Sequence, residues 1–349
     1  MAALLSGKKL GEQQKKKILM NNLIISCDWG TSQFRLSLVD TQSQVVLKKC
    51  STTDGILNLY THWSANEKDN CSLKTYYLKE LRKHVVALTK DHSDNPKNIP
   101  IIISGMASSS MGIIEMPYAA LPFTLDGKNA IVELIEPTTE FPFETMLISG
   151  VKGEDDLMRG EETQMVGIAE LVNSIKTSNE AVCIFPGTHS KHIKINNGSI
   201  TGFNTYMTGE LFQLLSTQSV LKEAVSISNN GIEENKEHFH KGIDDTNKNT
   251  NLLNQLFGVR TNVLMKKITK EKNYFYLSGL LIGYEMSVLR HTATEQIILC
   301  SGNSMFELYK IAIERVGIGA SIEFISPDLM EKSAIAGQIK IYQSHYQLK

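Results

Sequence analysis

The sequence predicts an α/β fold in two domains, built around a β-hairpin that occurs twice in the chain. Three observations support this prediction. The 349 residues exceed what one small core needs, and 42% apolar with 21% charged residues are typical of a soluble globular protein. Short apolar runs alternate with segments of helical periodicity. The two hairpins carry the same Gly-Thr pair at their turns.

The first hairpin spans residues 23–40 and comprises a buried strand, a tight turn and a second strand with alternating apolar residues. Gly30 gives the turn backbone freedom, and the hydroxyl and amide groups of Thr31 and Ser32 are placed to face a phosphate. Asp28 ends the buried strand, where a carboxylate can hold Mg²⁺ through its water shell. The alternative is an ordinary hairpin in which Asp28 only caps its own turn.

The second hairpin spans residues 181–200 and repeats this pattern. Gly187-Thr188 matches Gly30-Thr31 at an offset of 157 (187 − 30 and 188 − 31), and at this offset Ile193 matches Leu36. A repeated hairpin is much less expected by chance than either copy alone. The repeat therefore indicates an internal duplication.

The remaining segments complete the α/β pattern. A strand at 101–103 leads into a loop of small and hydroxyl residues, 104–112, which is a common place for a ligand, although a flexible connection is the alternative. A helix is expected near residue 208, capped by Thr208 or Gly209. We predict further strands at 45–50 and 297–300, helices at 73–89, 161–173, 252–265, 275–289, 305–316 and 333–341, a loop at 61–72, and a loop or exposed helix at 226–248.

The composition argues against several classes of function. A formal net charge of −1 offers no basic excess for nucleic acid or an anionic membrane surface, and no run reaches the ~18 apolar residues of a membrane span. The five cysteines form no C-x-x-C pair, which argues against a zinc ribbon or a thioredoxin-type site and favours the reducing cytoplasm. Residues 1–19 lack the long apolar core of a signal peptide and are expected to be a disordered extension or to precede the true start.

Six short motifs occur in the order typical of one family. They are Cys27-Asp-Trp-Gly-Thr-Ser, Ser104-Gly-Met-Ala-Ser-Ser, Leu157-Met-Arg-Gly-Glu-Glu-Thr-Gln164, Phe185-Pro-Gly-Thr-His-Ser-Lys191, Tyr206-Met-Thr-Gly-Glu-Leu-Phe212 and Gly279-Leu-Leu-Ile-Gly283. From about Met20 to about Gln338 the chain resembles the 2-dehydro-3-deoxygalactonokinase family, within the superfamily of sugar kinases, heat-shock chaperone ATPases and actin. The resemblance implies a two-domain actin-like ATPase (ribonuclease H-like) fold with an interdomain ATP cleft, with residues 20–165 as the first domain and 166–349 as the second.

The resemblance also implies an activity. It is transfer of the γ-phosphoryl group of ATP, with Mg²⁺, to the primary hydroxyl of 2-dehydro-3-deoxy-D-galactonate, which gives the 6-phosphate in galactonate catabolism. The partner is then a small sugar acid; no nucleic acid or membrane partner is expected, and a homodimer is a candidate assembly. Two alternatives are a kinase of another sugar or sugar acid on the same fold and a nucleotide-binding regulator without catalysis.

The acidic stretch 155–162 is expected to supply a catalytic base, because a sugar hydroxyl must lose its proton during phosphoryl transfer. The second hairpin has Phe185 where the first has Asp28, so no acid is available there. Asp156 and Glu161 are the two candidates. Asp156 is slightly favoured, because a short carboxylate in a loop reaches a ligand without unwinding a helix.

Arg159 is expected to bind the carboxylate of the substrate, since a guanidinium pairs with a carboxylate through two hydrogen bonds. Its alternative is an internal pair with Glu161 or Glu162.

Lys191 is expected to neutralise phosphate charge, or else to be a surface lysine on an alternating strand. The other implied contacts fall into three sets: Asp28 for Mg²⁺, with Gly30, Thr31, Ser32, Gly187, Thr188 and His189 for phosphate oxygens; Ser108, Ser109, Thr208 and Glu210 for sugar hydroxyls; and Ser301, Gly302 and Asn303 for the nucleotide, unless Ser301 or Asn303 only caps a helix.

Overall fold

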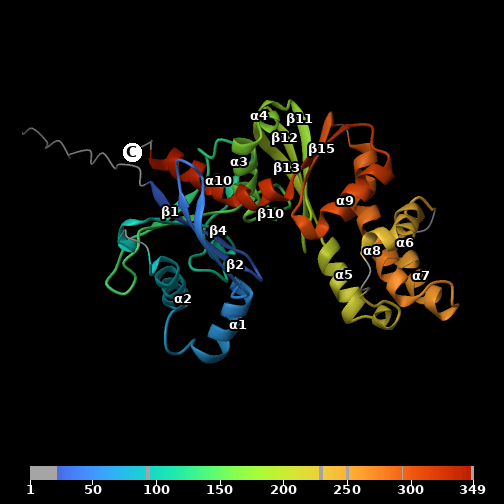
Figure 1. Ribbon diagram of the computed structural model, residues 1–349, viewed down its shortest axis with the longest axis horizontal. Coiled ribbons are helices and arrows are strands. Elements are labelled where there is room, and N and C mark those ends of the chain that lie inside the picture. Colours follow the sequence, from blue (N-terminus) through green and yellow to red (C-terminus); the bar gives the residue numbers. More distant parts are fainter. Residues whose placement is uncertain (1–21, 92–94, 228–230, 249–250, 293, 347–349) are drawn as a thin grey trace, which may run out of the picture.

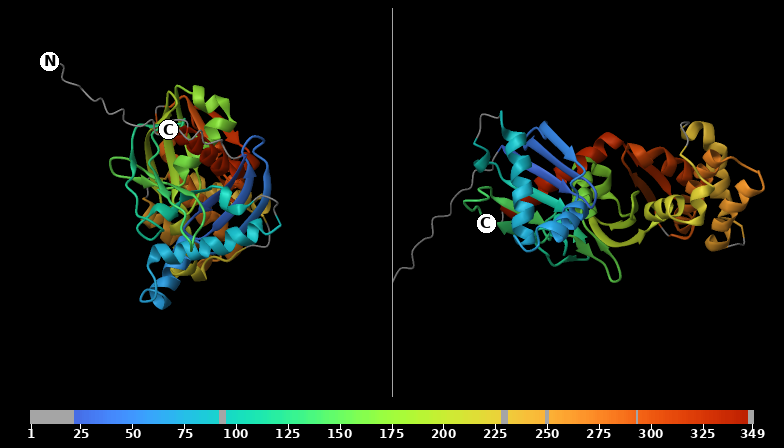
Figure 2. Two further views of the ribbon diagram at one scale, coloured as in Figure 1. Left: turned by 90° about the vertical axis from the view of Figure 1, so that its left-hand side faces the viewer. Right: turned by 90° about the horizontal axis from the view of Figure 1, so that it is seen from below.

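Two six-stranded sheets with helices between and around them make up the protein (Figures 1 and 2). The structure is a computed structural model that describes residues 22–91, 95–227, 231–248, 251–292 and 294–346, so the predicted extension at 1–19 lies outside the described residues. The first sheet has the order β3 (Val46–Thr52), β2 (Phe34–Asp40), β1 (Leu23–Trp29), β4 (Ile101–Gly105), β8 (Thr145–Ile148) and β7 (Val132–Ile135). The second has the order β15 (Ser321–Ile325), β14 (Gln296–Cys300), β11 (Glu180–Phe185), β12 (Ser190–Asn196), β13 (Ser199–Tyr206) and β6 (Phe123–Thr124). A small third sheet contains β10 (Leu157–Met158), β9 (Val151–Lys152) and β5 (Ala119–Ala120).

The two large sheets contain the same five-stranded unit. In the first, β3, β2 and β1 form an antiparallel meander, and β1 continues in parallel to β4 and β8. In the second, β13, β12 and β11 form the meander, and β11 continues in parallel to β14 and β15. The predicted duplication of the hairpin is therefore confirmed, and it extends beyond the hairpin to two parallel strands.

The predicted register of the repeat is wrong in its second strand. Cys27 lies opposite Leu36 in the first hairpin, and Ile184 lies opposite His192 in the second. The position of Leu36 thus corresponds to His192, at an offset of 156 (192 − 36), because the second turn is one residue shorter. Since side chains alternate between the faces of a strand, Ile193 points to the opposite face from the one expected.

Helices cover the outer face of each sheet. On the first sheet, α1 (Ile56–Asn66) and α2 (Leu73–Thr89) bury a core that includes Trp29 and Tyr77. On the second sheet, α6 (Ile232–Asp245), α8 (Lys270–Ser287) and α9 (Asn303–Val316) bury a core with β11 and β14. Helices α5 (Thr208–Thr217) and α7 (Leu252–Leu264) pack against α8. The remaining short helical segments are α4 (Asn173–Thr177), η1 (Pro96–Asn98), η2 (Met106–Ser108), η3 (Val220–Glu223) and η4 (Val288–His291).

Two helices, α3 (Glu161–Leu171) and α10 (Pro327–Tyr346), lie between the sheets and against each other (Figure 1). Their contact depends on two glycines: a Cβ on Gly167 would lie 1.8 Å from the Ser333 carbonyl oxygen, and one on Gly337 would lie 1.9 Å from the Thr163 carbonyl oxygen. Any side chain at either position would therefore force the helices apart.

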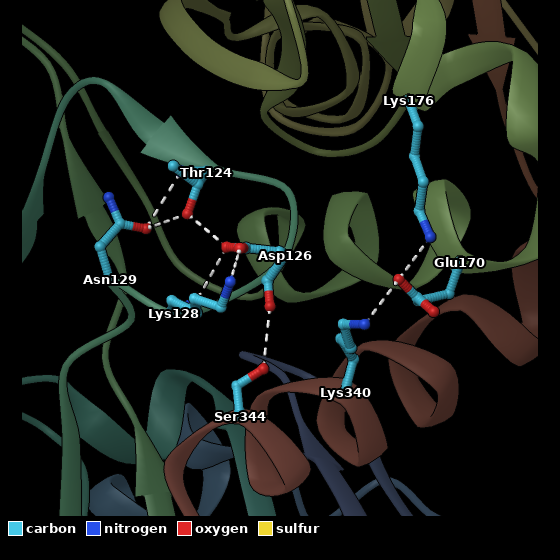
Figure 3. A network of polar contacts seen from close by, with 8 residues as sticks. All are labelled: Thr124, Asp126, Lys128, Asn129, Glu170, Lys176, Lys340 and Ser344. Atoms are coloured by element: carbon cyan, nitrogen blue, oxygen red, sulfur yellow. Dashed lines mark hydrogen bonds and ion pairs between the residues drawn. The ribbon is translucent and has the colours of Figure 1, made fainter. Parts of the chain in front are cut away.

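Polar contacts hold α10 in this position. Gln338 Nε2 donates to the Cys27 carbonyl oxygen (2.9 Å) and to Ser104 Oγ (2.8 Å), and so links the ends of β1 and β4. Figure 3 shows that Glu170 of α3 is approached by two lysines, with its Oε1 2.6 Å from Lys176 Nζ and 3.2 Å from Lys340 Nζ. The predicted domain boundary between 165 and 166 falls inside α3.

Helical periodicity predicted some elements well and others poorly. The helix at 73–89 is confirmed at both ends, with Ser72 Oγ accepting from the Thr75 amide as its N-cap. The loop predicted at 61–72 is wrong over 61–66, because α1 continues to Asn66 on the buried residues Ile56 and Leu59, and is confirmed over 67–72. Residues 226–248 contain α6, which is amphipathic and fully buries Phe239 against α8. The last helix, α10, begins at Pro327 instead of residue 333. No helix of the described ranges has the length and apolar character to cross a membrane.

Candidate active site

A cavity of about 1550 Å³ opens where the two hairpin turns approach each other. It is bordered by the loop after β4, the acidic stretch before α3, the end of β14 and the first turns of α10. The carboxyl ends of β1, β4, β11 and β14 all reach this cavity, because the duplicated sheets direct the same ends of their parallel strands toward it. Most of the residues predicted for phosphate and nucleotide line it, namely Asp28, Gly30, Thr31, Gly187, Thr188, His189, Lys191 and Gly302.

Asp28 stands at the end of β1 on one wall of the cavity. Arg35 lies directly opposite on β2 and donates from Nη1 to Asp28 Oδ2 at 2.8 Å. Ser32 is exposed in the same turn but is not among the residues that line the cavity. Arg35 was missed in the sequence, although its place opposite Asp28 in a short hairpin is a signal that could have identified it.

The second hairpin forms the facing wall. Lys191 is 5% exposed, and its Nζ donates to the His189 carbonyl oxygen (3.1 Å). The surface-lysine alternative is therefore wrong. In the duplicated unit Lys191 occupies the position of Arg35, since it lies opposite Phe185 as Arg35 lies opposite Asp28. Each hairpin thus places one cation next to the cavity.

Helix α5 begins directly behind the second turn. A Cβ on Gly209 would lie 2.5 Å from the Gly187 carbonyl oxygen, and the Glu210 amide donates to the Thr188 carbonyl oxygen (3.0 Å). Glu210 Oε2 lies 2.5 Å from His189 Nε2. The predicted cap by Thr208 or Gly209 is wrong, because the N-cap is Met207, which makes no side-chain cap hydrogen bond.

Glu161 is the first residue of α3 and reaches the cavity from the helix N-terminus. Its Oε1 lies 3.5 Å from Lys191 Nζ, whereas its Oε2 is buried without a hydrogen-bond partner. Gly160 precedes it at φ +105°, a backbone conformation that favours glycine, and packs closely on Gly105 at the end of β4. This sharp turn brings the start of α3 to the end of β4.

Asp156, the other candidate base, has a different environment. Its Oδ2 accepts from the Thr205 amide (2.6 Å), and its Oδ1 accepts from Thr205 Oγ1 (2.8 Å) and from the Leu157 amide (2.7 Å). Both carboxylate oxygens therefore tie the acidic stretch to β13. Within the acidic stretch, the first residue that lines the cavity is Leu157, and Asp156 does not line it.

Glu162 is almost fully buried next to Glu161. Burial, and to a lesser degree the charge of Glu161, raises the pKa of Glu162 to about 7. Its oxygens accept from the Gly160 amide (2.8 Å) and from Thr163 Oγ1 (2.8 Å). The partners of Glu162 are thus the Gly160 amide and Thr163 instead of Arg159, and the helix start holds two carboxylates in very different environments.

The guanidinium of Arg159 is held from three sides at the cavity wall. Its Nη1 donates to Ser108 Oγ (2.7 Å), its Nε to Tyr118 Oη (3.1 Å) and its Nη2 to the Met116 carbonyl oxygen (3.4 Å). Its central carbon lies 4.0 Å from the centre of the Tyr118 ring. These partners replace the internal pair with Glu161 or Glu162. Tyr118 lines the cavity and carries no motif that would have identified it from the sequence.

The remaining predicted contacts are divided between the two walls. Ser109 lines the cavity near Arg159, and Ser108 is buried behind it as an Arg159 partner. Thr208 is buried, and its hydroxyl donates to Glu285 instead of facing the cavity. At the start of α9 the N-cap is Gly302, without a side-chain cap, so the alternative of a plain cap by Ser301 or Asn303 is wrong.

The acidic residue at the end of β1 suits a Mg²⁺ ion that is held mainly by water and phosphates. Among the described residues no group of three or more acidic, His or Cys side chains converges, so no metal cage is built by protein atoms alone. Asp28 contributes one carboxylate at the cavity wall. A single carboxylate suits Mg²⁺, which keeps much of its water shell and takes further oxygens from phosphates.

Comparisons with known proteins agree with this arrangement. A family model described as 2-keto-3-deoxy-galactonokinase matches residues 28–337. A 2-dehydro-3-deoxygalactonokinase of Escherichia coli K12 is 30% identical over 299 residues, 84% of this chain and 90% of that protein. A Rhizobium meliloti protein assigned the same activity is 29% identical over 301 residues, 83% of this chain and 89% of that protein.

Solved structures agree as well. A Sinorhizobium meliloti protein assigned as a 2-dehydro-3-deoxygalactonokinase superposes with a TM-score of 0.73 at 26% identity, covering 92% of this chain and 96% of that one. Component A of an (R)-2-hydroxyglutaryl-CoA dehydratase from Acidaminococcus fermentans has a TM-score of 0.50 at 10% identity, with 92% and 98% covered, and shares the fold alone. With the duplicated sheets, these similarities confirm the predicted actin-like ATPase fold.

Proposed function

Because the chain belongs to the 2-keto-3-deoxy-galactonokinase family, we propose that it phosphorylates the primary hydroxyl of 2-dehydro-3-deoxy-D-galactonate with ATP, giving the 6-phosphate and ADP in galactonate catabolism. One observation in particular supports this proposal. The carboxylate-bearing residue Glu161 lines the cavity that two phosphate-type turns border, and its Oε1 lies 3.5 Å from Lys191 Nζ. A general base for a sugar hydroxyl must lie at the substrate cavity, and of the two candidate acids Glu161 lines this cavity whereas Asp156 does not.

The two hairpins are proposed to hold the triphosphate from opposite sides. The backbone amides of Thr31, Gly187 and Thr188 donate to phosphate oxygens, whereas the Gly30 amide closes its own turn by donating to the Gln33 carbonyl oxygen. Arg35 and Lys191 neutralise the phosphate charge. The amide-bearing start of α9 at Gly302 faces the nucleotide. Asp28 would hold Mg²⁺ through water, and the ion would supply further neutralisation of the phosphates.

Arg159 is proposed to bind the carboxylate of the sugar acid. Three of its five N–H groups are engaged by Ser108, Tyr118 and the Met116 carbonyl, which leaves one N–H on each terminal nitrogen for a bidentate contact. Because the guanidinium is already oriented by these partners, binding requires little further ordering of the side chain.

In the proposed reaction the substrate hydroxyl transfers its proton to Glu161. The hydroxyl oxygen forms a bond to the γ-phosphorus of ATP as the bond to the β,γ-bridging oxygen breaks, and ADP leaves. Lys191, whose Nζ lies 3.5 Å from Glu161 Oε1, places its positive charge near the transferred phosphoryl group. Asp156 is proposed to position the acidic stretch through Thr205 and not to receive the proton.

Separate replacement of the two acids tests this assignment. Glu161→Gln should lower kcat by about 10²–10⁴-fold with ATP binding retained, since a general base typically contributes this much. Asp156→Asn should leave kcat within a few-fold of the parent and lower the melting temperature, because it removes acceptors from β13. Steady-state kinetics and calorimetry measure both. The opposite pattern would make Asp156 the base.

A substrate panel with coupled ADP detection tests the identity of the substrate. Turnover with 2-dehydro-3-deoxygalactonate should exceed turnover with its gluconate epimer and with neutral sugars. Preference for another sugar acid would support the first alternative, and ATP binding without turnover of any sugar acid would support a regulatory protein.

We also keep the two domains, 20–165 and 166–349, as a proposal, and expect them to close on bound ligands and exclude water. Unchanged small-angle scattering with an ATP analogue and substrate would argue against closure.

A cytoplasmic location fits the five free thiols of the chain. We propose a homodimer as the assembly, and light scattering that gives the mass of one chain would contradict it.

A further inference from the structure

Glu285 of α8 is a buried carboxylate for which the reaction above has no role. It is 3% exposed and lies behind the second hairpin. Its Oε1 accepts from Ser190 Oγ (2.5 Å) and His192 Nε2 (3.1 Å). Its Oε2 accepts from Tyr309 Oη (2.7 Å) and from Thr208 Oγ1. Four donors therefore converge on one side chain.

The two carboxylate oxygens of Glu285 together have the acceptor capacity for these four hydrogen bonds. Each of its oxygens offers two lone-pair sites, and each receives two hydrogen bonds here. A glutamine of the same size would present an NH₂ group to two of the donors and leave buried groups unpaired. The network therefore requires two acceptor oxygens at this position and fixes one arrangement of its partners.

The donors come from the elements that form the nucleotide side of the cavity. Ser190 and His192 flank Lys191 on β12, and because side chains alternate along a strand, anchoring both directs Lys191 to the opposite face, toward Glu161. Thr208 starts α5, which packs on the backbone of Gly187 and Thr188.

The fourth donor, Tyr309, belongs to α9. The N-terminus of this helix meets the cavity at Gly302. A single carboxylate thus joins the phosphate turn, the helix that supports the turn and the helix that faces the nucleotide.

We propose that Glu285 is a positioning residue for ATP, which sets the second phosphate turn and Lys191 in place through its four hydrogen bonds. The proposal rests on the proposed ATP-dependent function, and it assigns the effect to the nucleotide and not to the sugar acid. The sugar side of the cavity, with Arg159 and Tyr118, is held by a separate set of contacts.

Kinetics of Glu285→Gln with each substrate varied in turn test the proposal. We expect KM for ATP to rise at least tenfold, with KM for the sugar acid within twofold of the parent. Asp245→Asn is the matched control, because Asp245 is also a buried carboxylate that accepts from a tyrosine, Tyr276 Oη (2.8 Å), but it lies on α6 outside the cavity lining. This control should lower the melting temperature and leave KM for ATP unchanged.

Two milder variants keep the proposal testable if Glu285→Gln does not fold. Ser190→Ala and Tyr309→Phe each remove one donor and retain the carboxylate, and each should raise KM for ATP by about threefold or more. An unchanged KM for ATP in these variants, or an equal rise for both substrates, overturns the proposal. Titration calorimetry with Mg²⁺-ADP tests the positioning role separately from the proposed function. Weaker ADP binding by the variants supports the positioning role even if the parent phosphorylates no sugar acid. Equal ADP binding by variants and parent refutes the positioning role.

Discussion

Raising the pH from 5 to 8 should destabilise the folded protein through Glu162. Burial and the charge of Glu161 raise the pKa of Glu162 from 4.5 to about 7. Between these values the folded state holds a proton that the unfolded chain has released, so the free energy of unfolding falls as pH rises through this window. A shift of this size corresponds to about 3 kcal/mol in total, all of it lost above pH 7.

Glu162→Gln isolates this contribution because an amide does not titrate. The variant can still accept from the Gly160 amide, so it should be about as stable as the parent at pH 5. At pH 8 it should be more stable by about 3 kcal/mol. Urea denaturation of both proteins at half-unit pH intervals measures the difference, in which the other titrating groups cancel.

Glu170→Gln, on the same helix, is the matched control. Burial opposes ionisation of Glu170, but hydrogen bonds from Lys176 and Lys340 outweigh it and lower the pKa of Glu170 (Figure 3). Its stabilising effect is therefore fully present above pH 5 and lost only as pH falls through the acid range. The control should be less stable than the parent by a constant amount from pH 5 to 8. The reasoning about Glu162 is refuted if the difference in free energy of unfolding between Glu162→Gln and the parent is also constant from pH 5 to 8.

Three further predictions concern the cavity and the helix contact. Asp28→Asn should lower kcat at least 100-fold with an unchanged melting temperature, measured by coupled ADP release and calorimetry; near-normal turnover would exclude a role in holding Mg²⁺. Arg159→Met should raise KM for the sugar acid about 100-fold and leave the affinity for Mg²⁺-ADP unchanged, because a lost charge-assisted pair is worth roughly 3 kcal/mol. Gly337→Ala should destabilise the protein by about 3 kcal/mol, since its Cβ would lie 1.9 Å from the Thr163 carbonyl oxygen, whereas Gly258→Ala in α7 meets no atom within 4 Å and should stabilise by up to about 1 kcal/mol in urea denaturation.

Local patterns were sufficient for many elements and for both hairpins. The helix at 73–89 was predicted at both ends because its apolar spacing and the cap at Ser72 are contained in the segment itself. The same reasoning failed at α1, where a polar surface hid the short apolar stripe of Ile56 and Leu59. It also failed for the register of the second hairpin, since the length of a turn is set by how the paired strands meet and not by the Gly-Thr pair.

The candidate site was predictable in its residue types and less so in its contacts. The sequence identified the acidic stretch, but Asp156 and Glu161 are equivalent there as carboxylates. They differ in the structure because Thr205, 49 residues from Asp156, occupies both of its oxygens. A related reason explains why Arg35, Tyr118 and Glu285 were missed. Nothing in the sequence around each of them indicates a function, and each became a candidate only through the residue that it contacts in the fold.

The sequence by itself determined the duplicated hairpin, many of the strands and helices and the family, because strand alternation, glycine turns and short motifs are local properties. The tertiary structure alone decided which side chains share an environment. Glu285 meets Ser190 across 95 residues, and Gln338 meets Cys27 across 311. Such contacts depend on how the sheets and helices pack, so burial, charge pairing and the free oxygen of Glu161 follow only from the folded arrangement.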